Sequence, residues 1–183
     1  MNSPDTEPGL VAKVLAIHDS FTSAGVEHAF GGALALAYWT EDPRTTAVID
    51  VNISVDAAGA SRVLDALPRG VAIPEEAMQR IATDEQVRVR WGRTPIDLFF
   101  RVTSFHDGIA ERTVQRPFAG RHLPFVCADD LAVLKSLFDR AKDWVDIAAM
   151  SDAGSLDLDT VIERVATIVG GDDARVDRLR RGA

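Results

Sequence analysis

The sequence predicts an α+β fold, in which a mixed β-sheet flanked by helices is followed by a helical C-terminal part. Apolar and polar residues alternate over 48–55, as expected of a half-buried strand. Two further strand-like segments, 86–91 and 96–102, flank a turn around Gly92 and predict a β-hairpin. Beyond residue 129 the apolar residues recur at helical spacing. Strands followed by a run of helices indicate an α+β arrangement.

The other elements follow from apolar periodicity and turn residues. Leu10, Val14, Ile17 and Phe21 recur at helical spacing, and Gly25 ends that helix. Asp129 is expected to be the N-cap of a later helix. In chain order, the sequence predicts helices over 10–24, 33–39, 57–67, 75–81, 105–113, 130–140, 142–150 and 158–169, a short strand over 26–30, and a two-stranded element over 114–126. The Arg-rich segment 175–181 is expected to be a short helix or a frayed tail.

A chain of 183 residues is long enough for one well-buried core but short for two full domains. We therefore expect an α/β core over 1–126, with a C-terminal helical region over 127–183 packed on it as one compact unit.

Composition limits the possible functions. Acidic residues number 28 against 20 basic ones, a net charge of −8, which argues against a general binder of nucleic-acid backbones. No apolar run approaches the roughly 20 residues that span a bilayer. The polar start of the chain resembles neither a signal peptide nor an anchor, and Cys127 is the only cysteine. These features predict a cytoplasmic protein without a membrane partner.

The segment from Gly31-Gly32 to Asp50 is the strongest candidate for a site. A glycine pair lets backbone approach a phosphate closely, although it could equally be a simple helix-entry turn. Asp50 lies on the polar face of its strand, and Asp97 lies within the apolar segment 96–100. Such an aspartate is costly to bury unless it binds a metal or is paired, for which Arg88 and Arg90 are the nearest candidates.

Val48 is an apolar residue on the polar face that also carries Asp50 and Asn52. This exception to the alternation suggests a site position whose polar residue has been lost.

Together, Gly31-Gly32, Arg44, Thr46, Ile49, Asp50 and Asp97 resemble the polymerase-beta-like nucleotidyltransferase superfamily, in particular its minimal bacterial and abortive-infection (AbiEii-like) types. In their pattern, Arg-x-Thr-x-Asp-Ile-Asp-Leu follows the glycine turn, and Val48 stands in place of the first Asp. The later family helix, Leu-x-x-Leu-Lys followed by Arg-x-Lys-Asp-x-x-Asp, is matched by Leu131, Leu134, Lys135, Arg140, Lys142, Asp143 and Asp146. The resemblance covers about residues 25–150.

The resemblance implies transfer of a nucleoside monophosphate from an NTP to a hydroxyl of tRNA, a protein or a small molecule. Asp50 and Asp97 would hold Mg²⁺, with Asp97 the better candidate to deprotonate the acceptor. The Gly31 and Gly32 amides would hold phosphates, assisted by Arg44, Thr46 and Lys135. A cognate toxin or antitoxin partner is also implied.

Several roles stay open at this point. Arg44 could clamp its loop to Asp50, and Lys135 could extend to solvent instead of reaching the triphosphate. Asp143 and Asp146 share a helical face and could orient Lys135, Arg140 or an acceptor, or form structural salt bridges. Because Val48 removes one carboxylate, a catalytically weakened pseudoenzyme that binds nucleotide or a protein partner is the alternative function.

Overall fold

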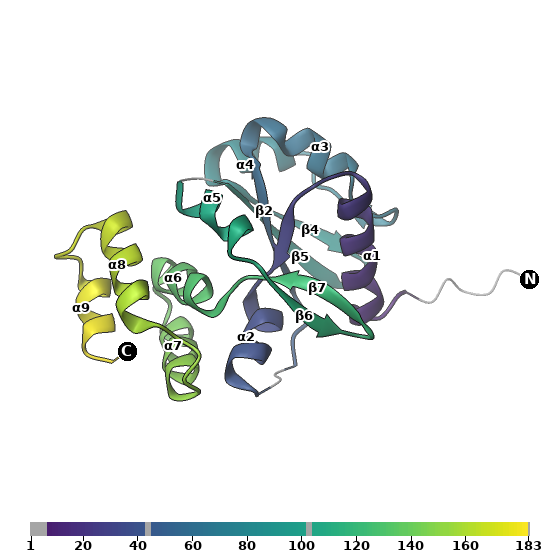
Figure 1. Ribbon diagram of the computed structural model, residues 1–183. Helices are drawn as coiled ribbons and strands as arrows, with labels where there is room; N and C mark the ends of the chain where they lie inside the picture. Colours follow the sequence, from purple (N-terminus) through teal and green to yellow (C-terminus); the bar gives the residue numbers. More distant parts are fainter. Residues whose placement is uncertain (1–6, 43–44, 102–103, 183) are drawn as a thin grey trace, which may run out of the picture.

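The computed structural model describes residues 7–42, 45–101 and 104–182. Within these ranges the strands form one seven-stranded mixed sheet, in the order β3-β4-β5-β2-β1-β7-β6 (Figure 1). The strands are β1 (His28–Phe30), β2 (Ile49–Asp56), β3 (Val71–Ala72), β4 (Gln86–Trp91), β5 (Thr94–Arg101), β6 (Val114–Phe118) and β7 (Arg121–Phe125).

The helices flank this sheet and dominate the C-terminal part, which confirms the predicted α+β fold. They are α1 (Leu10–Ser23), α2 (Gly32–Thr40), the 3₁₀ turn η1 (Ala57–Gly59), α3 (Ala60–Asp65), α4 (Ala77–Asp84), α5 (Ser104–Glu111), α6 (Ala128–Phe138), α7 (Ala141–Asp152), α8 (Leu158–Val169) and α9 (Ala174–Arg180). Among the helices of the described ranges, none is long and apolar enough to cross a bilayer.

Helix α1 runs along the sheet on the side away from the C-terminal helices (Figure 1). Of the apolar residues that predicted it, Val14, Ile17 and Phe21 are fully buried and Leu10 is partly buried. Lys13 is also buried, and its Nζ donates to the Trp91 carbonyl oxygen at 2.8 Å and to Thr94 Oγ1 at 2.9 Å. Together with an ion pair to Glu7, these bonds satisfy the ammonium group and fix α1 to the β4–β5 turn.

The centre of the sheet positions the candidate site. β2 pairs in parallel with β5 on one side and antiparallel with β1 on the other. Gly31 connects β1 to α2, and its backbone N–H donates to the Asp50 carbonyl oxygen at 2.9 Å. The start of α2 therefore lies directly beside β2.

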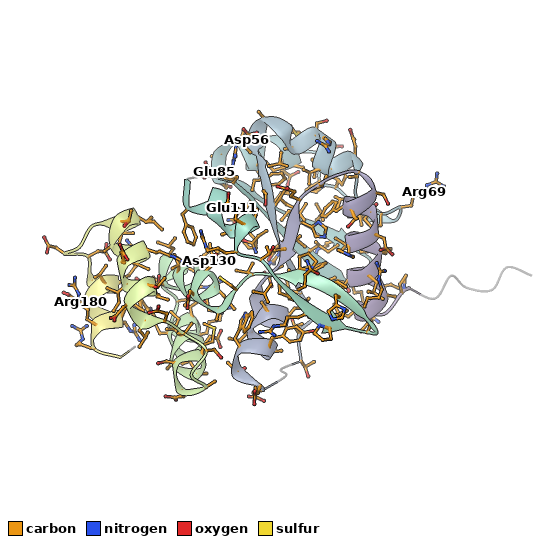
Figure 2. All side chains as sticks on the ribbon, in the orientation of Figure 1. Asp56, Arg69, Glu85, Glu111, Asp130 and Arg180 are labelled. Carbon is orange, nitrogen blue, oxygen red and sulfur yellow. The ribbon has the colours of Figure 1, made fainter. Side chains whose placement is uncertain are left out.

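The C-terminal helices pack on the core with α6 and α7 against α2. Ser155 Oγ donates to the carbonyl oxygen of Trp39 in α2 at 2.5 Å. Asp130, labelled in Figure 2, is fully buried on α6. It accepts from Arg112 at 2.8 and 3.0 Å and from Arg164 of α8 at 2.7 Å. Asp130 thus ties α6 and α8 to the segment after α5.

Two sequence predictions need correction. The N-cap of α6 is Cys127 rather than Asp129, and the helix begins at Ala128. The Asp129 carboxylate instead accepts from the backbone N–H of Asp157 at 2.9 Å, which joins α6 to the start of α8. The two-residue strand β3 was also missed, because an element that short carries no alternating pattern.

Candidate active site

Asp50 and Asp97 are directly paired across the parallel strands β2 and β5. The two candidate carboxylates therefore lie on neighbouring strands of the sheet. Both side chains line a cavity of about 790 Å³. Gly32, Thr46, Val48 and Lys135 also line it, whereas Arg44 lies outside the described residues.

The glycine turn is required by the packing of the β2 side chains. Gly32 has φ +52°, a left-handed conformation that favours glycine, and a Cβ there would overlap the Asp50 carboxylate. A Cβ at Gly31 would lie 2.6 Å from Asn52 Nδ2. The backbone conformation and the close packing therefore explain both glycines as residues of a helix-entry turn. Gly32 and Ala33 nevertheless line the cavity at the first turn of α2, where amides lack partners within the helix.

Asp50 is largely buried, and no described residue donates a hydrogen bond or forms an ion pair with its carboxylate. Burial raises its pKa to about 6, and the neighbouring charge of Asp97 adds to that rise. Lys135, Lys142 and Arg88 partly oppose the shift through their positive charges. Asp50 is therefore a carboxylate poised to accept a cation or a hydrogen-bond donor.

Asp97, by contrast, already has a partner, one of the two arginines considered from the sequence. Arg88 lies opposite it in the β4–β5 register. Arg88 Nε donates to Asp97 Oδ1 at 2.6 Å and Arg88 Nη2 donates to Oδ2 at 2.7 Å, a bidentate pair. The hydrogen bonds and charge of Asp97 raise the pKa of Arg88 further.

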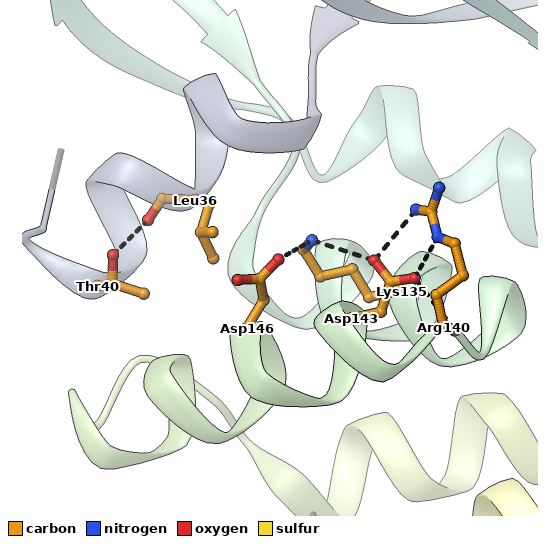
Figure 3. A network of polar contacts seen from close by, with 6 residues as sticks. All are labelled: Leu36, Thr40, Lys135, Arg140, Asp143 and Asp146. Atoms are coloured by element: carbon orange, nitrogen blue, oxygen red, sulfur yellow. Dashed lines mark hydrogen bonds and ion pairs between the residues drawn. The ribbon is translucent and has the colours of Figure 1, made fainter. Parts of the chain in front are cut away.

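Lys135 is nearly buried and lies between two carboxylates of α7 (Figure 3). Its Nζ donates to Asp146 Oδ2 at 2.6 Å and lies 3.5 Å from Asp143 Oδ1. Asp143 also accepts from Arg140, at 2.6 and 3.1 Å. Burial alone would raise the pKa of Asp143, but the Arg140 hydrogen bonds and the Lys135 charge outweigh it and lower that pKa. Asp143 and Asp146 therefore form ion pairs with Lys135, which agrees both with an orienting role and with the structural salt bridges left open by the sequence.

Thr46 and Val48 form a local turn before β2. Thr46 Oγ1 donates to the Val48 carbonyl oxygen at 3.0 Å and accepts from the Val48 N–H at 3.1 Å. This fixes the chain where it enters the cavity wall. Val48 itself lines the cavity.

The donor set is compatible with a magnesium ion, although it is smaller than a full protein cage. Among the described residues, no three His, Cys, Asp or Glu side chains are grouped to hold a metal. Mg²⁺, however, is commonly held by one or two carboxylates and completed by waters and substrate phosphates. Asp50 and Asp97, adjacent across β2 and β5, meet that smaller requirement.

The structure adds cavity residues that sequence reasoning had not assigned to the site. Arg88 appeared there only as a possible salt-bridge partner. Phe99 and Phe138, both lining the cavity, contact each other with ring centroids 5.9 Å apart. The hairpin alternation places residue 99 on the face of Asp97, so Phe99 could have been found from the sequence. Phe138 depends on how α6 packs and could not.

Comparison with known proteins identifies the fold. The crystal structure of ANT(2'')-Ia in complex with adenylyl-2''-tobramycin has a TM-score of 0.57 and 10% identity, covering 93% of this chain and 97% of that chain. The solution structure of the antibiotic-resistance factor ANT(2'')-Ia has a TM-score of 0.51 and 12% identity, covering 93% and 89%.

An antigenic nucleotidyltransferase-like protein from Paracoccidioides brasiliensis has a TM-score of 0.52 and 13% identity, covering 90% of this chain and 91% of that chain. No protein-family model and no curated protein sequence matches this chain. The structural similarities extend over nearly the whole chain, and they show that it has the nucleotidyltransferase fold.

Proposed function

We propose that this protein binds an NTP together with Mg²⁺ and transfers the nucleoside monophosphate to a hydroxyl group. One observation carries the proposal: Asp50 and Asp97 are adjacent across two parallel strands and line the same cavity as the start of α2. The first turn of a helix offers free amides and a positive dipole end, which favour phosphate. The shared fold with ANT(2'')-Ia supports the same reading.

The charges of the cavity explain why the nucleotide would need a cation. Six carboxylates and four cationic side chains line it, so its formal charge is −2. Three of the cations, Arg88, Lys135 and Arg140, are already paired with carboxylates. A bare triphosphate would therefore be repelled, and bound Mg²⁺ would neutralise the phosphates and polarise the reacting group.

In the proposed reaction, the acceptor hydroxyl oxygen bonds to the α-phosphorus while the bond from that phosphorus to the bridging oxygen breaks. Pyrophosphate leaves, and the hydroxyl proton passes to a carboxylate of the pair. In the metal-free protein Arg88 donates to both oxygens of Asp97, so Asp97 can take this proton only after that ion pair opens. Asp97 is the acceptor that the family resemblance favours, and Asp50 would act as a ligand of the cation.

Lys135 has a supporting role in this proposal. Asp146 and Asp143 hold its ammonium group in the cavity wall, where it lowers the negative potential around Asp50. It would contact a phosphate if the triphosphate extends along α6. The acceptor class stays open among tRNA, a protein and a small molecule, and an AbiEii-like toxin–antitoxin role is part of the same proposal.

A nucleotide-binding pseudoenzyme is the second candidate. Val48 lines the cavity where the family pattern has an aspartate, and Arg88 already pairs with the carboxylate of Asp97. Both features reduce the charge available for a metal without closing the cavity. This candidate predicts nucleotide binding without transfer.

Calorimetric titration with a non-hydrolysable NTP analogue tests the proposal, with and without Mg²⁺. We expect binding that requires Mg²⁺ and that is weakened at least tenfold in Asp50→Asn. Label from α-³²P NTPs should then appear in total tRNA, a partner protein or an aminoglycoside. Binding without transfer to any acceptor would favour the pseudoenzyme, and no binding in either condition would refute both candidates.

A further inference from the structure

Arg88 holds the position from which a cation would reach Asp97. The β4–β5 register places Arg88 directly opposite Asp97, and its guanidinium takes both carboxylate oxygens. The same side chain lines the cavity that holds Asp50. Arg88 therefore supplies the positive charge beside Asp97 that a bound metal ion would otherwise supply.

The Arg88–Asp97 ion pair is placed where the two side chains can separate. The Arg88 side chain is 52% exposed, whereas that of Asp97 is 17% exposed. The guanidinium can thus move outward without losing a buried packing position. Because Arg88 already reaches solvent, water can hydrate its guanidinium when it leaves Asp97, and a divalent cation can take its place at the carboxylate.

A released Arg88 would have an evident second partner. Its planar guanidinium matches the two oxygens of a phosphate as well as it matches a carboxylate. Lys135 lacks this freedom because it is buried on Asp146. The Arg140 side chain is as exposed as that of Arg88, but its carboxylate partner Asp143 is fully buried and its guanidinium lies 4.8 Å from the centre of the Phe138 ring. Among the paired cations of the cavity, Arg88 is the exposed one whose carboxylate partner also reaches solvent.

We propose that Arg88 exchanges partners: it neutralises Asp97 in the free protein, yields Asp97 to the divalent cation when metal and nucleotide bind, and then contacts a phosphate. This inference rests on the proposed function for its phosphate half, while the competition for Asp97 stands on the Arg88–Asp97 geometry alone. Arg88 is accordingly a nucleotide-binding residue as well as a competitor of the metal.

The test compares Arg88→Gln with Arg90→Gln. Arg90 lies two residues further on β4, is exposed on the same face and does not line the cavity, so its replacement makes the same change in charge. Mn²⁺ binding without nucleotide is measured from the paramagnetic resonance signal of the free ion. We expect Arg88→Gln to bind Mn²⁺ about two- to fivefold more tightly than wild type, and Arg90→Gln to match wild type.

The second arm measures the affinity for a non-hydrolysable NTP analogue in saturating Mg²⁺ by calorimetry. Here Arg88→Gln should bind about tenfold more weakly, because a charge-assisted phosphate contact is lost. Arg88→Lys, which keeps the charge but not the bidentate geometry, should fall between. A purely structural role for Arg88 would not shift the two affinities in opposite directions.

An Asp97→Asn background supplies the internal check. There the Arg88→Gln effect on Mn²⁺ should disappear, since the competition requires the carboxylate. Equal Mn²⁺ affinities of Arg88→Gln and Arg90→Gln, or no Mn²⁺ binding by either, would overturn the inference. Tighter binding of both Mn²⁺ and nucleotide by Arg88→Gln would overturn its phosphate half. If wild type binds Mn²⁺ but no nucleotide, the proposed function fails while the Mn²⁺ comparison still decides the competition.

Discussion

Asp130 and Asp50 are two aspartates shielded from solvent in opposite surroundings. Asp130 is fully buried at the junction of α6 and α8, where Arg112 and Arg164 surround it with three hydrogen bonds. Asp50 is largely buried in the cavity wall, its carboxylate unpartnered among the described residues, and its pKa is raised to about 6. The first arrangement stabilises a fold, whereas the second costs stability and is typical of a site kept ready for a ligand.

The largest effect is expected at Asp130. Asp130→Asn leaves two arginines without their carboxylate, and it should lower the free energy of unfolding by about 3 kcal/mol. Both arginines reach solvent in part, which keeps the loss near the low end of the usual range. Urea unfolding at pH 7.5 measures it. Asp172→Asn, at an exposed position, is the control and should change stability by less than about 0.5 kcal/mol.

Next comes the contact between Gly32 and Asp50. Gly32→Ala must accept a left-handed backbone and overlap the Asp50 carboxylate, for an expected loss of about 2–3 kcal/mol. Gly154→Ala is the matched control, because Gly154 has φ +68° and open space around its Cβ position. It should lose only about 1 kcal/mol to backbone strain. Equal losses in the two variants would mean that the Asp50 contact is unimportant to the turn.

A stabilising effect of the opposite sign is expected for Asp50→Asn. The folded pKa of about 6 lies above the ordinary value of 3.8, so the folded state holds a proton that the unfolded chain releases. Wild-type stability contributed by this group is thus present below about pH 4 and is lost as the pH rises through 6. Because asparagine does not ionise, Asp50→Asn does not lose this stability as the pH rises.

The expected gain in unfolding free energy is roughly 1–3 kcal/mol at pH 8, fading toward pH 4. Urea unfolding of both proteins across this pH range checks it. Destabilisation of Asp50→Asn at pH 8 on the scale expected for Asp130→Asn would show that Asp50 is a structural residue, and would remove the contrast between the two aspartates.

The smallest change in stability is expected from Val48→Asp. This variant adds a second unpaired carboxylate beside Asp50 and so sharpens the contrast between the cavity and the paired Asp130. Without metal, the new carboxylate near Asp50 should cost about 1 kcal/mol through like-charge repulsion. With metal, it should tighten Mn²⁺ binding and accelerate label transfer from α-³²P NTPs, each by about tenfold. Strong wild-type transfer that falls in Val48→Asp would instead mean that Val48 belongs to a working variant of the site.

The sequence was sufficient for the features that depend on strand alternation. Ile49 and Val51 had to face the core, so Asp50 had to face away from it, and the same argument placed Asp97. The β2–β5 register then brings the two together. Alternation is local and strict in its period, which is why it predicted these positions correctly.

Features that depend on packing between distant segments were harder to predict from the sequence. The Lys135–Asp146 pair forms only because α6 and α7 pack side by side, and the sequence left that pairing as one alternative among several. Asp129 looked like an N-cap but bonds to the backbone of Asp157 at the start of α8 instead. The reason for glycine at Gly32 is the Asp50 side chain, a contact between two segments that the sequence could not reveal.

The central claim is that the Asp50–Asp97 cavity takes a metal-bound nucleotide. A crystal structure with Mn²⁺ and a non-hydrolysable NTP analogue, with the metal located by its anomalous scattering, tests it most directly. We expect a Mn²⁺ peak within about 2.3 Å of an oxygen of both Asp50 and Asp97, with phosphates beside the first turn of α2. Nucleotide bound outside this cavity, or a metal that contacts neither carboxylate, would contradict it.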